Sequence, residues 1–350
     1  MRKIIVLFVA TIFILSTMSA VMGTKVLSEE RITSHIDYQE AIPEIYGDII
    51  VWEDNRNVNW NIYGYDLRTK QEFPICTAAT NQLSPVIYGD IVVWADNRNG
   101  NGDIYGYDLR AKQEFPICTA ATNQLSPVIY GDIVVWVDNR NGNYDIYRYD
   151  LRTKQETPIC TADLDQYGPA IYGDIVVWAD YRNGSTNIDI YGYNLKTGEN
   201  LFICTYSGNQ TYPAIYGDIV VWADYRNGST NIDIYGYNLK TGENLFICTY
   251  SGNQTYPAIY GDIVVWADYR NGSTNIDIYG HNLITKQEFP ICISNNDQVD
   301  PSIYCGRVVW GDYRNGDWDI YLANLDVVCK TGTSLPMQQF MKLLGLGKKD

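Results

Sequence analysis

The chain has 350 residues, of which 26 are Lys or Arg, 41 are Asp or Glu and only 2 are His. Its formal net charge of -15 opposes binding to a dense array of phosphates, so nucleic acid is excluded as an expected partner. The 30 tyrosines and 9 tryptophans indicate aromatic-rich β-structure, and two histidines leave little material for histidine-based catalysis.

Residues 1–23 have the layout of a secretory signal peptide. Arg2 and Lys3 precede an apolar run at 4–15, and small and polar residues follow it. We therefore expect an exported or cell-surface protein that begins near Thr24 and has no integral membrane domain after signal removal. An uncleaved anchor is the alternative, although the apolar run is shorter than the ~20 residues of a comfortable membrane span.

Residues 24–330 form a tandem repeat. The tyrosine of the motif Ile-Tyr-Gly-Asp, or of its variant, recurs with spacings of 42, 42, 42, 44, 44 and 44 residues at Tyr46, Tyr88, Tyr130, Tyr172, Tyr216, Tyr260 and Tyr304. The seven repeats start near residues 43, 85, 127, 169, 213, 257 and 301, and those starting at 169 and 213 are identical over all 44 residues. This period is typical of β-propeller blades.

Each repeat predicts four strands. In the unit 85–126 these are PVIYG, DIVVWAD, DIYGYDL and EFPICT, separated by a Gly-Asp turn, an Asn/Gly loop and a polar turn. The second strand is apolar without alternation, as expected of a strand covered on both faces by neighbouring blades. We predict an all-β, seven-bladed β-propeller of four-stranded antiparallel blades.

The two ends of the chain are expected to meet in the seventh blade. The last repeat departs from the pattern after its third strand, and ERITSH at 30–35 aligns with the fourth strand EFPICT of the other repeats. In this alignment Ser34 takes the position of the repeat cysteine. The N-terminal strand would then close the ring, which removes open sheet edges.

The segments VVWADYRNG and DIYGYDL resemble the TolB-like β-propeller repeat, in which a strand ending near Arg-x-Gly leads into an Asp-Ile-Tyr strand and an Asp-Leu turn. The variants with DNRNG resemble the propeller repeats of archaeal cell-surface proteins. The resemblance covers residues 43–324. It implies a propeller fold and a surface location, and it implies no reaction.

The fixed order of Asp and Arg in every repeat, followed in most repeats by a second acid, is interpreted as a set of structural ion pairs. One Asp closes the second strand, Arg follows two residues later, and a second acid in most repeats opens the third strand. An arginine between two carboxylates would hold the loop shut through charge-assisted hydrogen bonds. The assigned groups are Asp96, Arg98 and Asp103; Asp180, Arg182 and Asp189; Asp224, Arg226 and Asp233; and Asp268, Arg270 and Asp277.

The same loops offer calcium binding as an alternative, because 96–103 is rich in Asp, Asn and Gly. The third position of the loop, where an EF-hand needs an oxygen ligand, is Arg in all seven repeats, so we assign no metal and no cofactor. No nucleophile elbow, zinc motif or phosphate loop is present, so we assign no catalytic residue. His281 stands where two sister repeats have Tyr, and His35 has no evident partner in the sequence.

The cysteines fall into two groups. Six of the eight occupy one equivalent position in successive repeats, beyond the roughly 7 Å between Cα atoms that a disulfide allows, and are expected to be small buried residues. Cys305 and Cys329 lie outside this pattern and are candidates for a disulfide that staples the last blade. Alternatively, Cys329 is the repeat cysteine of a shortened blade.

Two further features concern the surface. Met337, Phe340, Met341 and Leu344 are at helical spacing and predict a short amphipathic helix within 331–350. Five Asn-x-Ser/Thr sequons are candidate glycosylation sites, and strand alternation places them on one face of the disc. They are Asn183, Asn209, Asn227, Asn253 and Asn271.

The functional expectation is a non-catalytic binding or scaffold module for protein or polysaccharide partners at the cell surface. Near-identical blades present the same chemistry several times over, whereas an active site needs blades that differ. A carbohydrate-active hydrolase or lyase that uses acidic residues of the central pocket is the alternative.

Overall fold

A computed structural model describes residues 23–35 and 38–329. The signal segment predicted at 1–23, apart from its last residue, and the helix predicted within 331–350 lie outside the described residues. Over the described ranges, no helix has the length and apolar character that crossing a membrane requires.

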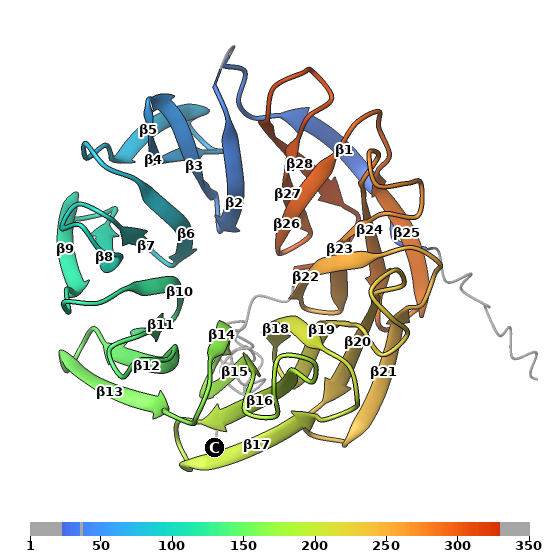
Figure 1. Ribbon diagram of the computed structural model, residues 1–350. Helices are drawn as coiled ribbons and strands as arrows, with labels where there is room; N and C mark the ends of the chain where they lie inside the picture. The colour runs from blue at the N-terminus through green and yellow to red at the C-terminus, as the bar shows by residue number, and fades with distance from the viewer. Residues whose placement is uncertain (1–22, 36–37, 330–350) are drawn as a thin grey trace, which may run out of the picture.

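The strands form seven four-stranded antiparallel sheets arranged as blades around a central axis (Figure 1). The innermost strands of blades one to seven are β2 (Glu40–Tyr46), β6 (Gln82–Tyr88), β10 (Gln124–Tyr130), β14 (Gln166–Tyr172), β18 (Gln210–Tyr216), β22 (Gln254–Tyr260) and β26 (Gln298–Tyr304). The second strands are β3 (Ile49–Asn57), β7 (Ile91–Asp96), β11 (Ile133–Asp138), β15 (Ile175–Asp180), β19 (Ile219–Asp224), β23 (Ile263–Asp268) and β27 (Arg307–Asp312). The third strands are β4 (Asn59–Asp66), β8 (Asp103–Asp108), β12 (Asp145–Asp150), β16 (Asp189–Asn194), β20 (Asp233–Asn238), β24 (Asp277–Asn282) and β28 (Asp319–Leu325). The outermost strands are β5 (Gln71–Cys76), β9 (Gln113–Cys118), β13 (Gln155–Cys160), β17 (Glu199–Cys204), β21 (Glu243–Cys248), β25 (Gln287–Cys292) and, in blade seven, β1 (Val26–Arg31).

This arrangement confirms the predicted seven-bladed propeller. The hydrophobic core lies between successive blades, because each second strand is apolar on both faces. Trp136 of blade three, for example, is fully buried and belongs to one cluster with Val93 and Ile104 of blade two. Burial of each such side chain contributes about 2 to 3 kcal/mol to stability.

The N-terminal strand closes the ring, as predicted, but its register differs by one residue from the sequence alignment. Glu29 pairs with Ala323 as the outer-strand Glu114 pairs with Tyr107 in blade two. The hydroxyl of Thr33 accepts a hydrogen bond from the backbone N of Ile320, 2.9 Å away, so Thr33 rather than Ser34 takes the place of the repeat cysteine. No cysteine marks the register here, and the connection to blade one is one residue longer than elsewhere.

A disulfide joins Cys305 to Cys329, with the two Cα atoms 4.8 Å apart. Cys305 occupies the turn between β26 and β27 at a φ of 55°, where the equivalent residue of blade two is Gly89 at 61°. The bridge ties this turn to the segment that follows β28. It therefore fastens the blade in which the two ends of the chain meet.

Removal of this disulfide should destabilise the closed ring. Replacing Cys305 and Cys329 by Ser is expected to lower the free energy of unfolding by about 3 kcal/mol, because the bridge closes a loop with a sequence separation of 24 residues. Urea denaturation measures the loss. A reductant should shift the wild-type midpoint toward that of the double variant and leave the variant unchanged. An unchanged wild-type midpoint would contradict this role.

Candidate functional site

Each blade contains a buried aspartate that closes its second strand and is saturated with donors. Asp224 is fully buried and accepts from Trp222 Nε1 at 2.9 Å, from the backbone N and Nε of Arg226 at 2.9 Å, and from Arg226 NH2 at 2.6 Å. The guanidinium also stacks on Tyr235, with 4.0 Å between its carbon and the ring centroid. All seven blades contain this Trp-Asp-Arg-Tyr unit.

The prediction that the same arginine also binds the acid of the third strand is wrong. Asp233 instead accepts from the side-chain amides of Asn227, at 2.6 Å, and Asn231, at 3.2 Å. The stack on the tyrosine directs each arginine outward, away from that acid. Five blades have a glutamate at one equivalent position of the outermost strand, and in these blades the arginine pairs with it. The glutamates are Glu72, Glu114, Glu156, Glu288 and Glu29.

The other assigned third-strand acids follow the same rule. Asp103 accepts from Asn99 and Asn101, Asp189 from Asn183 and Asn187, and Asp277 from Asn271. The assigned pairs that do form are Arg98 with Asp96, Arg182 with Asp180, Arg226 with Asp224 and Arg270 with Asp268, each at 2.6 Å. The Asp and Arg side chains of the repeated motif are therefore paired with each other within each blade.

The candidate glycosylation sites also have structural contacts. The side-chain nitrogen of Asn183, Asn227 and Asn271 is a hydrogen-bond donor to the third-strand acid at 2.6–2.7 Å. The side-chain oxygen of Asn209 and Asn253 accepts from a backbone N at 3.1 Å. A glycan on Asn227 would have to be attached to the nitrogen that holds Asp233.

Tyrosines of the innermost strands surround the central axis near one face of the disc. The ring centroids of neighbours lie 4.6–4.8 Å apart, and the last member contacts the first, so the ring is closed. Burial, together with the neighbouring tyrosines, raises the pKa of several of these phenols, so they are neutral. The members are Tyr46, Tyr88, Tyr130, Tyr172, Tyr216, Tyr260 and Tyr304.

Three acids near the axis are specific to blades one and seven. Glu44 accepts from Ser302 Oγ at 2.7 Å, and Glu53 accepts from the backbone N of Ser84. Burial, with a smaller contribution from the charge of Asp300, raises the pKa of both glutamates to about 7, and burial raises the pKa of Asp300. The two glutamates can therefore exchange protons near neutral pH.

The repeated sequence motifs do not point to these acids, because the motifs consist of what the blades share. The signal was available in the repeats, since the equivalents of Glu44 are Val, Ala or Ser and those of Glu53 are Ala, Val or Gly. One blade pair therefore differs chemically from the others.

At the opposite end of the axis from the tyrosine ring, on the face of the DYRNG loops, other tyrosines gather. We call Tyr167, Tyr181, Tyr212 and Tyr256 the tyrosine mouth. Tyr167 lies 5.6 Å from Tyr181 and Tyr212 lies 4.4 Å from Tyr256, centroid to centroid. A cavity of about 340 Å³ is lined by three of them together with Gly168, Ala179 and Thr211.

Two of these tyrosines occupy bulges of the innermost strands. Tyr212 and Tyr256 have φ values of 53° and 51°, as the equivalent residues of the other blades also do. A left-handed conformation is costly for a bulky residue and persists where the surrounding structure imposes it. The two residues are 43% and 40% exposed, so the bulge presents aromatic surface to solvent.

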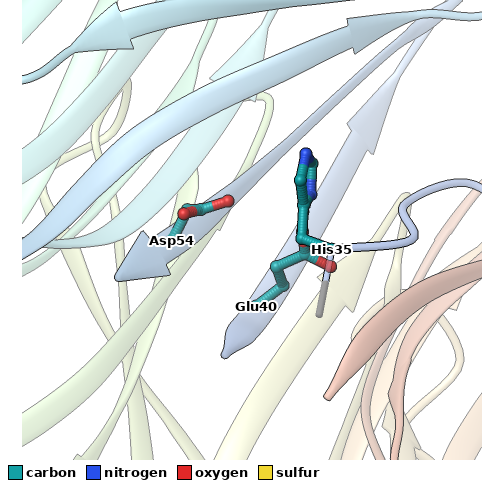
Figure 2. Close-up of side chains that lie close together, drawn as sticks. All are labelled: His35, Glu40 and Asp54. Carbon is teal, nitrogen blue, oxygen red and sulfur yellow. The ribbon is translucent and has the colours of Figure 1, made fainter. Parts of the chain in front are cut away.

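A third cluster lies where blades seven and one meet (Figure 2). His35 Nδ1 is 2.7 Å from Glu40 Oε1, so His35 has a partner that the sequence did not reveal. Burial raises the pKa of Glu40 to about 7. His35, Glu40 and Asp54 could in principle ligate a metal ion, since one potential ligand atom from each lies within 4.8 Å of the others.

The surroundings of this cluster do not suit a metal ion. Arg56 pairs with Asp54 and Glu72 and lies 3.9 Å from Glu40, so a cation already neutralises these carboxylates. A metal ion would have to displace Arg56 or bind beside its positive charge. His281 is 8% exposed, and burial lowers its pKa, so it is a neutral core residue.

The six repeat cysteines are free thiols at the blade junctions. Cys204, for example, is buried, and its sulfur lies 3.9 Å from NH2 of Arg226 in the next blade. Burial raises the pKa of Cys204 to about 11, so the thiol is protonated and unreactive.

No family model and no curated protein matches the chain. Solved structures do match. An oligogalacturonate lyase in complex with manganese is similar at 16% identity, 85% coverage of this chain, 93% of that chain and a TM-score of 0.63. The propeller domain of the Trilobed protease from Pyrococcus furiosus has 13% identity, coverages of 82% and 95%, and a TM-score of 0.65. TolB from Acinetobacter baumannii has 16% identity, coverages of 81% and 78%, and a TM-score of 0.51.

These similarities identify the fold alone. The Pyrococcus domain is described as having an open velcro topology, whereas here β1 pairs with β28 and closes the ring with a strand. The neighbours include enzymes and TolB, so the fold does not decide between catalysis and binding.

The arginine units should behave as structural pins of unequal strength. Arg226→Ala is expected to lower the free energy of unfolding by about 1.5 to 3 kcal/mol, because Asp224 stays buried without its cation. Arg270→Ala should cost about 0.5 kcal/mol more, since Arg270 also pairs with Glu288. Urea denaturation measures both. Arg110→Ala, at an 82% exposed side chain, is the control and should match wild type; equal midpoints for all three variants would refute the assignment.

Proposed function

We propose that the protein is an exported or cell-surface, non-catalytic binding module whose ligand is a saccharide chain held at the tyrosine mouth. The observation that carries this proposal is the exposed pair Tyr212 and Tyr256 on left-handed bulges beside a cavity of about 340 Å³. Tyrosine offers a rigid aromatic face to the apolar C–H face of a sugar ring and a hydroxyl to its rim.

The negative charge around the tyrosine mouth favours some classes of saccharide over others. Burial and the neighbouring Tyr212 raise the pKa of the Tyr256 phenol, and Asp300 lies close enough to add a smaller contribution. Carboxyl oxygens accept hydrogen bonds from sugar hydroxyls, and the net charge of -15 repels a polyanion. A neutral or amino saccharide therefore fits better than the acidic oligosaccharide named for the lyase neighbour.

The alternative is a carbohydrate-active enzyme that uses the acids of blades one and seven. Glu44 and Glu53, with pKa values raised to about 7, could serve as general acids near neutral pH. Incubation of the protein with a bound saccharide, followed by analysis of the products, distinguishes the two functions. Products that disappear in the Glu53→Gln variant would favour the enzyme.

Loss of the mouth tyrosines should weaken saccharide binding. A glycan array identifies the ligand, and calorimetry then measures Kd. Tyr212→Ala and Tyr256→Ala should each raise Kd about five- to thirtyfold, because an aromatic anchor is worth about 1 to 2 kcal/mol. Phe246→Ala, at a residue that is 70% exposed on the outermost strand of blade five, is the matched control and should bind like wild type. Binding lost in the control alone would place the ligand on the rim.

A further inference from the structure

Where two blades meet, the acid that opens a third strand lies beside the glutamine that begins the next innermost strand. The backbone N of Gln254 donates to the carbonyl of Ile232, the residue before Asp233, at 2.7 Å. Both side chains are fully buried. We call the five such sets the junction pairs: Asp103 with Gln124, Asp145 with Gln166, Asp189 with Gln210, Asp233 with Gln254, and Asp277 with Gln298.

The glutamine of each junction pair has one unsatisfied atom. Gln254 Nε2 donates to the carbonyls of Gly252 and Tyr250, at 3.1 and 3.2 Å, which sets the orientation of the amide. Its Oε1 is buried and has no donor, and the same holds in all five pairs. A buried carbonyl oxygen without a partner costs about 1 to 3 kcal/mol.

The junction between blades one and two shows what this oxygen faces. There the third strand carries Asn61 in place of Asp, and Asn61 Nδ2 donates to Gln82 Oε1 at 3.0 Å. The side chain at this position is therefore within hydrogen-bonding distance of the glutamine oxygen. In the junction pairs the residue at this register position is Asp, whose side chain has an oxygen where that of Asn61 has this nitrogen.

The junction between blades seven and one departs in another way. Arg31 NH2 binds Asp319 at 2.6 Å, and Glu40 replaces the glutamine and is held by Thr33 and His35. At both departures the chain itself supplies a hydrogen-bond donor. The five junction pairs instead place two acceptors together.

We propose that Asp145, Asp189, Asp233 and Asp277 are carboxylic acids in the folded protein, each donating its proton to the glutamine oxygen of the next blade. The folded ring then holds one proton at each of four buried sites, taken from water as the chain folds. A neutral carboxyl reproduces the N–H of Asn61 in shape and in hydrogen bonding.

The surroundings support the neutral form. Burial raises the pKa of Asp145, Asp189, Asp233 and Asp277. The charged groups that act on Asp189 are Asp180, which raises its pKa, and Arg182, which lowers it; Arg182 is already paired with Asp180.

The other ionisable groups around the junction aspartates do not favour their ionised form. The thiol of Cys204 also faces Asp189 and is protonated. The negative charges of Asp138 and Asp165 both raise the pKa of Asp145. A calcium ion would need six or more oxygen ligands. At the equivalent junction Asn61 Nδ2 and Gln82 Oε1 are 3.0 Å apart, which is the distance of one direct hydrogen bond.

The proposal predicts the sign of the pH dependence. An acid whose pKa is raised on folding stabilises the protein fully below its unfolded pKa of about 4, and that contribution is lost as pH rises through the folded pKa. Glu40, Glu44 and Glu53 act in the same direction, so the informative quantity is the difference between wild type and variant.

The test is urea denaturation of the full chain across pH, with Asn replacing Asp145, Asp189, Asp233 and Asp277 singly and together. Asp233→Asn should be tolerated and should reduce the number of protons taken up on folding by up to one; the fourfold variant should reduce it by up to four. Asp224→Asn, which removes the charge paired with Arg226, is the matched control and should lower stability across the pH range.

Two results would overturn the proposal. A proton uptake that is the same in wild type and the fourfold variant would mean that the aspartates are ionised and that each Gln amide is turned to donate to them. Added calcium that raises the wild-type midpoint but not that of the fourfold variant would mean that a cation occupies the junction. A protonated-carboxyl infrared band that the fourfold variant loses would support the proposal directly.

Discussion

The propeller depends on one interaction repeated around the ring, the fully buried carboxylate that closes each second strand. Asp224 is held by an indole N–H, a backbone N–H and a guanidinium, and the guanidinium is itself held against a tyrosine ring. A buried charge is tolerable only when it is paired and hydrogen-bonded, so these four residues must be present together. This requirement explains why Trp, Asp, Arg and Tyr occur as a set while the loops between them vary in length.

The sequence predicted the features that depend on period and alternation. Blade number, strand order and closure followed from the spacing of one tyrosine and from the incomplete last repeat. The partners of charged side chains could not be predicted in the same way. Arg226 and Asp233 are close in sequence, but whether they pair depends on the direction of a long side chain, which the stack on Tyr235 decides. Likewise, His35 and Glu40 meet only because the N-terminal strand docks beside blade one.

The candidate binding surface illustrates a second limit. A comparison of the seven repeats shows the residues that they share, which form the scaffold, and draws attention away from residues that are specific to one blade. Glu44, Glu53 and Asp300 differ in residue type from their equivalents in the other blades. Tyr212 has the same positive φ as its equivalents Ser84 and Ser126, because all three lie at the same bulge of the innermost strand. The backbone of the bulge is therefore common to the ring, and the side chain placed on it differs from blade to blade.

Closure by β1 has a consequence for the order of assembly. Most contacts within a blade join residues close in sequence, whereas Arg31 and Asp319 are 288 positions apart. Contacts of such long range form late, because the entropy of closing the loop must be met before they contribute. Until then β28 presents an unpaired edge, at which another copy could dock its own N-terminal strand. A strand exchange of this kind would link copies into a chain of rings, and the concentration of newly made protein would decide between the closed monomer and that assembly.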